Sequence, residues 1–186
     1  MKKLFIYSML LIAFVTVSCK TESLQSYLVE SQEKEGFMTF DLPASALQLS
    51  MDKASEEDKK AYESIKKINI TGVPYKNLDE ASYEAEKEKL KSILKKSNYK
   101  ELVKFKKDGA NAAIYYLGEA DAIDEIVAFG YGKGMGVGVA RVLGENMDVN
   151  KIMEMMQKAN FDGGNVDLKQ FKMILGDSDI VSEKAE

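Results

Sequence analysis

The 186-residue chain contains no histidine and no tryptophan, and it has only one cysteine and two prolines. Without histidine there is no imidazole base, no imidazole metal ligand, and no serine–histidine–aspartate or cysteine–histidine catalytic unit. A single cysteine cannot form a disulfide within the chain. Any catalytic chemistry is therefore left to aspartate, glutamate, lysine or tyrosine side chains.

The chain also lacks a hydrophobic run long enough to span a membrane. Its almost wholly apolar stretch, Leu4 to Val17, has 14 residues, whereas a transmembrane helix needs about 20. The stretch follows the basic start Met1-Lys2-Lys3 and ends in small residues before Cys19. This order is typical of a secretory signal peptide. We therefore expect residues 1–18 to be removed and to form no part of the folded domain.

The end of this stretch, Val15-Thr16-Val17-Ser18-Cys19, resembles the lipobox of bacterial lipoproteins. Thr16 departs from the pattern, because most lipoboxes carry an aliphatic residue there. The resemblance implies that the Cys19 thiol receives a diacylglycerol and that cleavage leaves an acylated N-terminal cysteine. Two or more acyl chains hold a protein stably on a membrane, so Cys19 is the expected lipid-attachment residue. The alternative is an ordinary signal peptide followed by an incidental cysteine.

The mature chain is long enough for one domain that buries about two-thirds of its surface. Removal of Lys2 and Lys3 takes the formal net charge from −4 to −6, and no clustered basic face points to nucleic acid. We expect no cofactor and no metal. The expected division is a lipidated N-terminus and short tether at residues 19–22, one α+β domain at 23–175, and a polar, disordered tail at 176–186.

Hydrophobic periodicity predicts both helices and strands in the mature chain. Helices are expected at residues 23–35, 55–67, 79–96 and 148–158, with a short amphipathic piece at 166–175. Strands are expected at residues 37–40, 68–73, 99–106, 112–117, 125–131 and 135–143. Asp108-Gly109 is a turn signal between the strands 99–106 and 112–117, and Gly132-Lys133-Gly134 is one between 125–131 and 135–143. The predicted fold class is α+β, with a mostly antiparallel sheet built around a four-strand meander and packed with flanking helices.

Glycine recurs at every second residue at Gly130, Gly132, Gly134, Gly136 and Gly138. The spacing matches neither the G-x-G-x-x-G dinucleotide fingerprint nor a Walker loop. In a strand, a period of two places these residues on one face. The opposite face is expected to carry Phe129, Tyr131, Met135, Val137 and Val139. We interpret the glycines as a sheet face without side chains, which a helix can approach closely or where the sheet can bend. The alternative is close approach of a ligand or a partner strand.

Acidic residues cluster in the predicted connection Gly118–Asp124 and just after it. They are Glu119, Asp121, Asp124 and Glu125. The D-x-D-x-D-G spacing of a calcium loop is absent. A solvated acidic loop is therefore the favoured interpretation, with a metal site as the alternative.

Several short segments together resemble one family. They are Ser23-Leu24-Gln25, Tyr27-Leu28-Val29, Lys67-Ile68-Asn69-Ile70, the stretch from Tyr83 to Lys87, the stretch from Asp121 to Glu125, Phe129-Gly130, and the stretch from Arg141 to Met147. The family is that of the uncharacterised lipoproteins called domain of unknown function 4252, typical of flavobacteria and their relatives. The resemblance covers roughly residues 23–158. It implies an envelope lipoprotein with an α+β domain, and it carries over no catalytic residue.

The leading hypothesis is a lipid-anchored protein of the cell envelope, expected at the outer membrane of a Gram-negative bacterium. Its domain would bind another envelope component, such as a protein partner, or help to maintain or sense the envelope. The alternatives are an envelope hydrolase that uses carboxylate or lysine chemistry, and a small-molecule carrier. A hydrolase predicts a cleft with perturbed pKa values, and a carrier predicts an enclosed apolar cavity.

Overall fold

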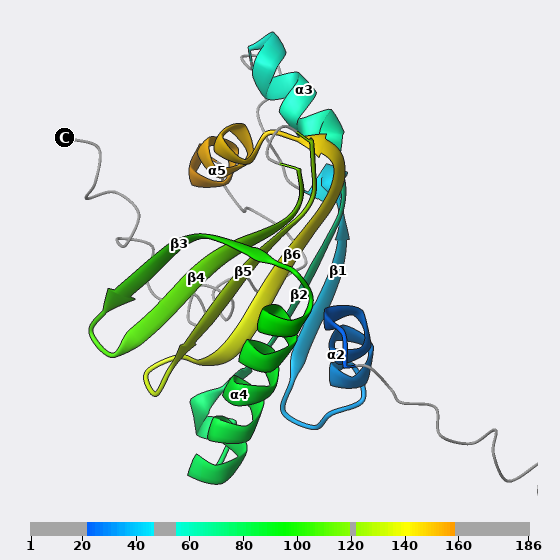
Figure 1. Ribbon diagram of the computed structural model, residues 1–186. Coiled ribbons are helices and arrows are strands. Elements are labelled where there is room, and N and C mark those ends of the chain that lie inside the picture. The colour runs from blue at the N-terminus through cyan, green and yellow to red at the C-terminus, as the bar shows by residue number, and fades with distance from the viewer. Residues whose placement is uncertain (1–21, 47–54, 120–121, 159–186) are drawn as a thin grey trace, which may run out of the picture.

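The computed structural model describes residues 22–46, 55–119 and 122–158 (Figure 1). The helices are α2 (Leu24–Ser31), α3 (Glu56–Ser64), α4 (Glu80–Lys96) and α5 (Val149–Lys158). The strands are β1 (Met38–Pro43), β2 (Ile65–Pro74), β3 (Lys100–Lys107), β4 (Ala110–Glu119), β5 (Ala122–Gly132) and β6 (Gly136–Met147). The expected signal peptide, most of the tether, the amphipathic piece at 166–175 and the tail lie outside the described residues.

The six strands form one antiparallel sheet in the order β1-β2-β6-β5-β4-β3. Strands β3 to β6 are the predicted meander, and β2 and β1 extend it from the β6 side. The predicted α+β class is therefore confirmed. Pro43 ends β1, which is an edge strand, and the strands of a sheet tolerate proline at such an edge.

Local signals explain α4 well. The Asp79 carboxylate caps the helix by accepting from the Ser82 backbone N–H at 2.7 Å. The buried stripe is the predicted one, formed by Tyr83, Leu90, Ile93 and Leu94. The prediction that α3 reaches residue 67 is wrong. The helix ends at Ser64, because the chain from Ile65 onward pairs with β6.

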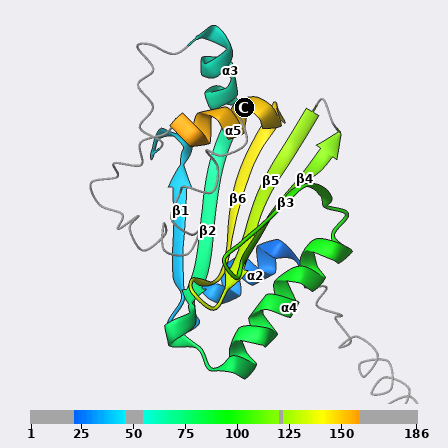
Figure 2. The same cartoon turned by 90° about the vertical axis from the view of Figure 1, so that its left-hand side faces the viewer.

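Helices cover both faces of the sheet, and each face has its own apolar core. On the face covered by α2 and α4 (the α2/α4 face), the core contains Leu24, Tyr27, Leu28, Val73, Tyr83, Leu90, Ile93, Leu94, Val127, Phe129, Val137 and Val139. On the face covered by α3 and α5 (the α3/α5 face), it contains Ala61, Ile65, Ile68, Ile70, Ile123, Ile126, Val142, Met147, Val149 and Ile152. Figures 1 and 2 show α3 and α5 at one end of the sheet, while the β5–β6 turn lies at the other.

The described helices are all too short or too polar to cross a lipid bilayer.

Candidate functional site

Helix α2 is the described helix nearest to the predicted lipid-attachment residue, since Leu24 follows Cys19 by five positions. Cys19 itself lies outside the described residues. A reciprocal capping box fixes the start of α2. The Ser23 hydroxyl accepts from the Ser26 N–H at 3.1 Å, and the Ser26 hydroxyl accepts from the Ser23 N–H at 2.9 Å. These two hydrogen bonds therefore hold the first turn of α2 in place.

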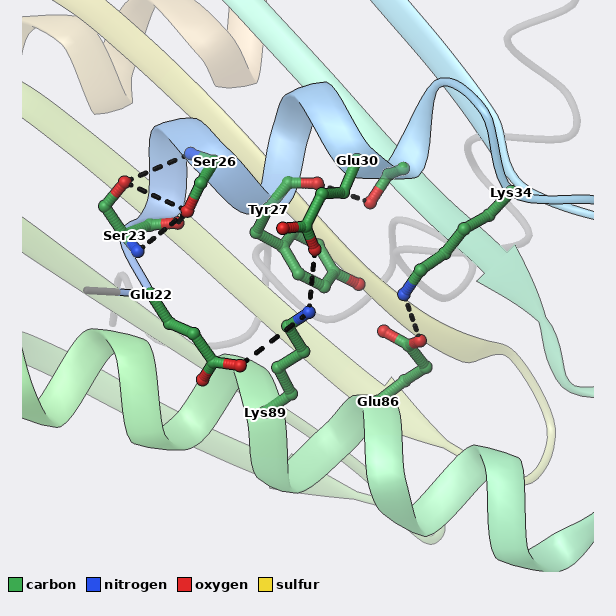
Figure 3. Close-up of polar contacts among 9 residues, drawn as sticks. Glu22, Ser23, Ser26, Tyr27, Glu30, Lys34, Glu86 and Lys89 are labelled. Carbon is green, nitrogen blue, oxygen red and sulfur yellow. Dashed lines mark hydrogen bonds and ion pairs between the residues drawn. The ribbon is translucent and has the colours of Figure 1, made fainter. Parts of the chain in front are cut away.

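One side of α2 packs into the core of the α2/α4 face. Leu24, Tyr27 and Leu28 are all at most 3% exposed. The same core contains Leu90 and Ile93 of α4. Figure 3 shows α2 lying directly alongside α4 at this contact. Full burial of side chains such as these stabilises a contact by about 1.5–3 kcal/mol each, so α2 is firmly held on the domain.

Ion pairs border this contact (Figure 3). Lys89 Nζ of α4 lies 2.9 Å from Glu30 Oε2 of α2 and 4.0 Å from Glu22 Oε1. Its hydrogen bond with Glu30 raises the pKa of Lys89. Lys34 Nζ lies 2.5 Å from Glu86 Oε1. Ion pairs at the surface contribute up to about 1 kcal/mol each, and these pairs are partly exposed. They therefore stabilise the position of α2 less than its buried apolar side chains do.

Tyr27 lies at the centre of the α2–α4 contact. The Lys34 and Lys89 ammonium groups are 5.6 and 5.7 Å from the centroid of its ring, within the range of cation–π attraction. Burial, and then the Glu86 charge, raise the pKa of Tyr27. In the described part of the chain, neither the Tyr27 hydroxyl nor Glu86 Oε2 has a hydrogen-bond partner. The phenol therefore stays neutral, and its role is packing.

A second contact joins α2 to the centre of the sheet through Arg141 of β6. The Arg141 guanidinium donates to both carboxylate oxygens of Glu125, at 2.8 and 3.0 Å, and to Gln25 Oε1 of α2 at 2.6 Å. Tyr99 donates its hydroxyl to Glu125 at 2.5 Å. The side chains of Arg141 and Glu125 are only 12% and 6% exposed. This is a buried, bidentate ion pair.

The position of Glu125 corrects the prediction of a solvated acidic loop. Strand β4 continues to Glu119 and β5 begins at Ala122, so only residues 120 and 121 separate the two strands. Glu125 is a buried strand residue, whereas Asp124 and Glu119 are exposed. Within the described residues, no three acidic side chains gather as a metal ion would need.

The pKa shifts found among the described side chains share one pattern. Wherever a pKa departs from its ordinary value, it moves away from neutrality, downward for carboxyl groups and upward for lysines and tyrosines. The hydrogen bonds with Ser82 lower the pKa of Asp79. Burial and the hydrogen bond to Glu125 raise the pKa of Tyr99. A catalytic base or an activated lysine requires the opposite direction. At neutral pH the shifted carboxyl and lysine groups therefore hold their charge, and the shifted tyrosines stay neutral.

Two surface hollows have volumes in the range of ligand pockets. One, of about 340 Å³, lies beside Phe37, Thr39 and Asp41. The other, of about 390 Å³, lies between Tyr83 of α4 and Tyr131 of β5. Both are open to solvent and lined in part by polar residues, so neither is an enclosed apolar cavity.

The glycine repeat lies in the β5–β6 hairpin. Gly130 is opposite Gly138 and Gly132 is opposite Gly136, while Gly134 is in the turn between the strands. Because Gly134 belongs to the turn and not to a strand, it does not share the glycine face as expected, and a Cβ built on it would meet nothing within 4 Å. The close neighbours of the other glycines are strands and turns: Ala110 and Gly109 for Gly132, and Val73 to Tyr75 for Gly136.

Met135 is also placed differently from the prediction. Its Cε lies 3.3 Å from a Cβ built on Gly130, so Met135 covers the glycine face instead of the opposite face. Phe129, Val137 and Val139 do lie on the opposite face, in the core under α2 and α4. Sequence reasoning missed Gly72, which is paired with Gly138 across β2 and β6. The sequence gives no local signal for that pairing, because 66 positions separate the two residues.

The capping box offers a test of how α2 is held. We expect Ser23→Ala to lower the free energy of unfolding by about 1 kcal/mol, because it removes the side-chain acceptor for the Ser26 N–H. Urea unfolding followed by circular dichroism measures the change. Glu33→Ala, at an exposed residue beyond the helix, is the matched control. Equal stability of the two variants would contradict a role for the cap.

Comparison with known families identifies a related family. The family model described as Domain of unknown function (DUF4252) matches residues 27–155, which run from α2 through the whole sheet into α5. No curated protein matches the chain, and no solved structure matches it.

Proposed function

We propose that this chain, which belongs to the DUF4252 family, is a non-enzymatic binding module that a lipid on Cys19 holds at a membrane of the bacterial cell envelope. The observation that carries the proposal is the short distance in sequence between Cys19 and the firmly packed α2. Only residues 20–22 separate Cys19 from the Ser23 cap. Fully extended, this connection spans at most about 14 Å.

A tether of this length would keep the domain against the membrane surface. Because α2 is fixed to α4 by buried side chains and to the sheet through Arg141, the anchor would also restrict how the domain turns. The proposed location is the outer membrane of a Gram-negative bacterium. There the domain would bind an envelope protein or another envelope component, and so maintain or sense the envelope.

Two properties of the described residues favour binding over the alternatives. The pKa shifts lower carboxyl groups such as Asp79 and raise lysines and tyrosines such as Lys89 and Tyr99, which is the opposite of what a catalytic base or an activated nucleophile needs. The two hollows are open and partly polar, unlike the cavity of a small-molecule carrier. We therefore propose neither of these activities.

Lipid attachment is tested by labelling cells with a clickable fatty acid. The wild-type chain is expected to carry the label and to sediment with membranes, and Cys19→Ser is expected to lose both properties because the acceptor thiol is gone. Thr21→Ala, two residues further on, is a control that keeps the thiol and should keep the label. Equal labelling of wild type and Cys19→Ser would refute the anchor.

Binding is tested separately by crosslinking in cells. The wild-type protein is expected to capture the same envelope component in repeated preparations. The crosslinking yield of Cys19→Ser is expected to be at least about tenfold lower. The loss is expected because the lipid confines protein and partner to one surface. Hydrolysis of envelope substrates by the purified chain, with no reproducible capture, would overturn the binding proposal while leaving the anchor intact.

A further inference from the structure

Small side chains form a continuous row across the sheet on its α3/α5 face. Residues paired directly across neighbouring strands share a face. From β1 to β3 in spatial order, the row is Met38, Gly72, Gly138, Gly130, Ala112 and Phe105. Three glycines and an alanine thus form a floor four strands wide, with a large, half-buried apolar side chain on each edge strand.

Side chains on this face become larger from the floor toward α5. Two residues along each strand, toward α5, the row on the same face is Phe40, Ile70, Ala140, Ala128, Ile114 and Val103. Two residues further, the central positions are Val142 and Ile126, which pack in the core with α5. In the centre of the sheet, side chains therefore shrink from valine and isoleucine through alanine to glycine. We call this feature the trough.

The trough has the dimensions of a helix or an extended segment. Strands are spaced about 4.8 Å apart, so Met38 and Phe105 stand about 24 Å apart across five intervals. A helix with its side chains is about 10 Å wide. Among the described residues, the atoms nearest to a Cβ on Gly130 belong to Met135 and Asn111, and none belongs to a helix. The described helices of this face lie at the other end of the sheet (Figure 2).

The position of α5 indicates what fills the trough. Val149 and Ile152 pack on the α3/α5 face, so the chain leaves α5 on that side of the sheet. The sequence continues for 28 residues after Lys158. The level of Gly138 is four residues along β6 from that of Val142, or about 13 Å. The seven residues 159–165 can span up to about 23 Å, which exceeds this distance along the sheet.

The sequence after this connection has the required apolar side chains. Val166, Leu168, Phe171, Ile174 and Leu175 recur at intervals that give an apolar face. We propose that residues 166–175 pack this face into the trough, with Phe171 over Gly72 and Gly138, next to the Met135 side chain that covers Gly130. The glycine repeat then serves the close approach of the chain's own C-terminal segment. This packing does not depend on the lipid anchor.

The chain allows a direct crosslinking test, because Cys19 is its only cysteine. In the full-length Cys19→Ser background, Met38→Cys and Phe171→Cys are combined and treated with a short bismaleimide. An intrachain link is expected at a yield at least about tenfold above that of the control pair Val29→Cys and Phe171→Cys, because effective concentration governs the yield. Val29 is a suitable control because it is 52% exposed on α2, on the other side of the sheet.

Filling the trough provides a second, independent test. Ala112→Leu is expected to displace residues 166–175 and to raise the rate of trypsin cleavage after Lys169 and Lys172 by about tenfold, because cleavage follows the exposed population. Lys106→Leu places the same side chain on the neighbouring strand, facing the other side, and should leave the rate unchanged. Equal crosslinking of the two cysteine pairs, links found only between two chains, or equal cleavage of folded Ala112→Leu and wild type would overturn the proposal.

Discussion

Replacing Glu125 by glutamine is expected to lower the free energy of unfolding by about 3–5 kcal/mol. The substitution keeps the shape of the side chain but removes the charge that faces the buried Arg141 guanidinium. An uncompensated buried charge is far more costly than the loss of a surface ion pair. The Tyr99 hydroxyl would also lose its carboxylate acceptor. Urea unfolding of the full-length Cys19→Ser protein measures the change.

Glu119→Gln is the matched control for this prediction. Glu119 belongs to the same acidic stretch, but its side chain is 85% exposed and its Oε2 lies 4.0 Å from Lys100 Nζ. We expect an effect within about 0.5 kcal/mol. A double variant, Glu125→Met with Arg141→Met, removes both charges and should recover much of the stability. Equal effects of Glu125→Gln and Glu119→Gln would contradict the ion pair.

The contrast between these two glutamates shows where sequence reasoning stops. Both occur in a short acidic stretch, and local composition predicts a solvated loop for each. Glu125 is buried because β6 brings Arg141 beside it from 16 positions further along the chain. That encounter depends on the register of the β5–β6 pair, in which Val127 faces Arg141. Periodicity predicts the strands, but not the register shift between Ile123 and Glu125.

Helix α4 and the meander could be predicted because their determinants are local. Asp79 immediately precedes α4, the buried stripe lies within that helix, and Asp108-Gly109 lies between the two strands that it connects. The floor of the trough depends instead on Gly72, which reaches Gly138 through a pairing of β2 with β6. A strand order that departs from the order in the sequence is a tertiary property. The glycine repeat could therefore be seen in advance, but the trough could not.

The β5–β6 turn offers the second large effect. Gly136→Ala is expected to destabilise the protein by at least about 3 kcal/mol, the combined cost of a strained backbone conformation and an overpacked contact. Gly136 has φ of +120°, which side chains rarely adopt. Its Cβ would overlap the Val73 carbonyl oxygen and lie 2.8 Å from Pro74 Cα and from the backbone nitrogen of Tyr75. These are backbone atoms that the sheet holds in place.

Gly134→Ala, two residues earlier in the same turn, is the matched control. A Cβ there would meet nothing within 4 Å, and the reduced freedom of the unfolded chain would stabilise the protein by about 0.4–1 kcal/mol. The two variants add the same methyl group to the same turn, so they separate the close approach of β2 to Gly136 from a general need for glycine. Urea midpoints that shift equally would refute the constraint. Opposite shifts would show that, at Gly136, the glycine is required because β2 lies against it.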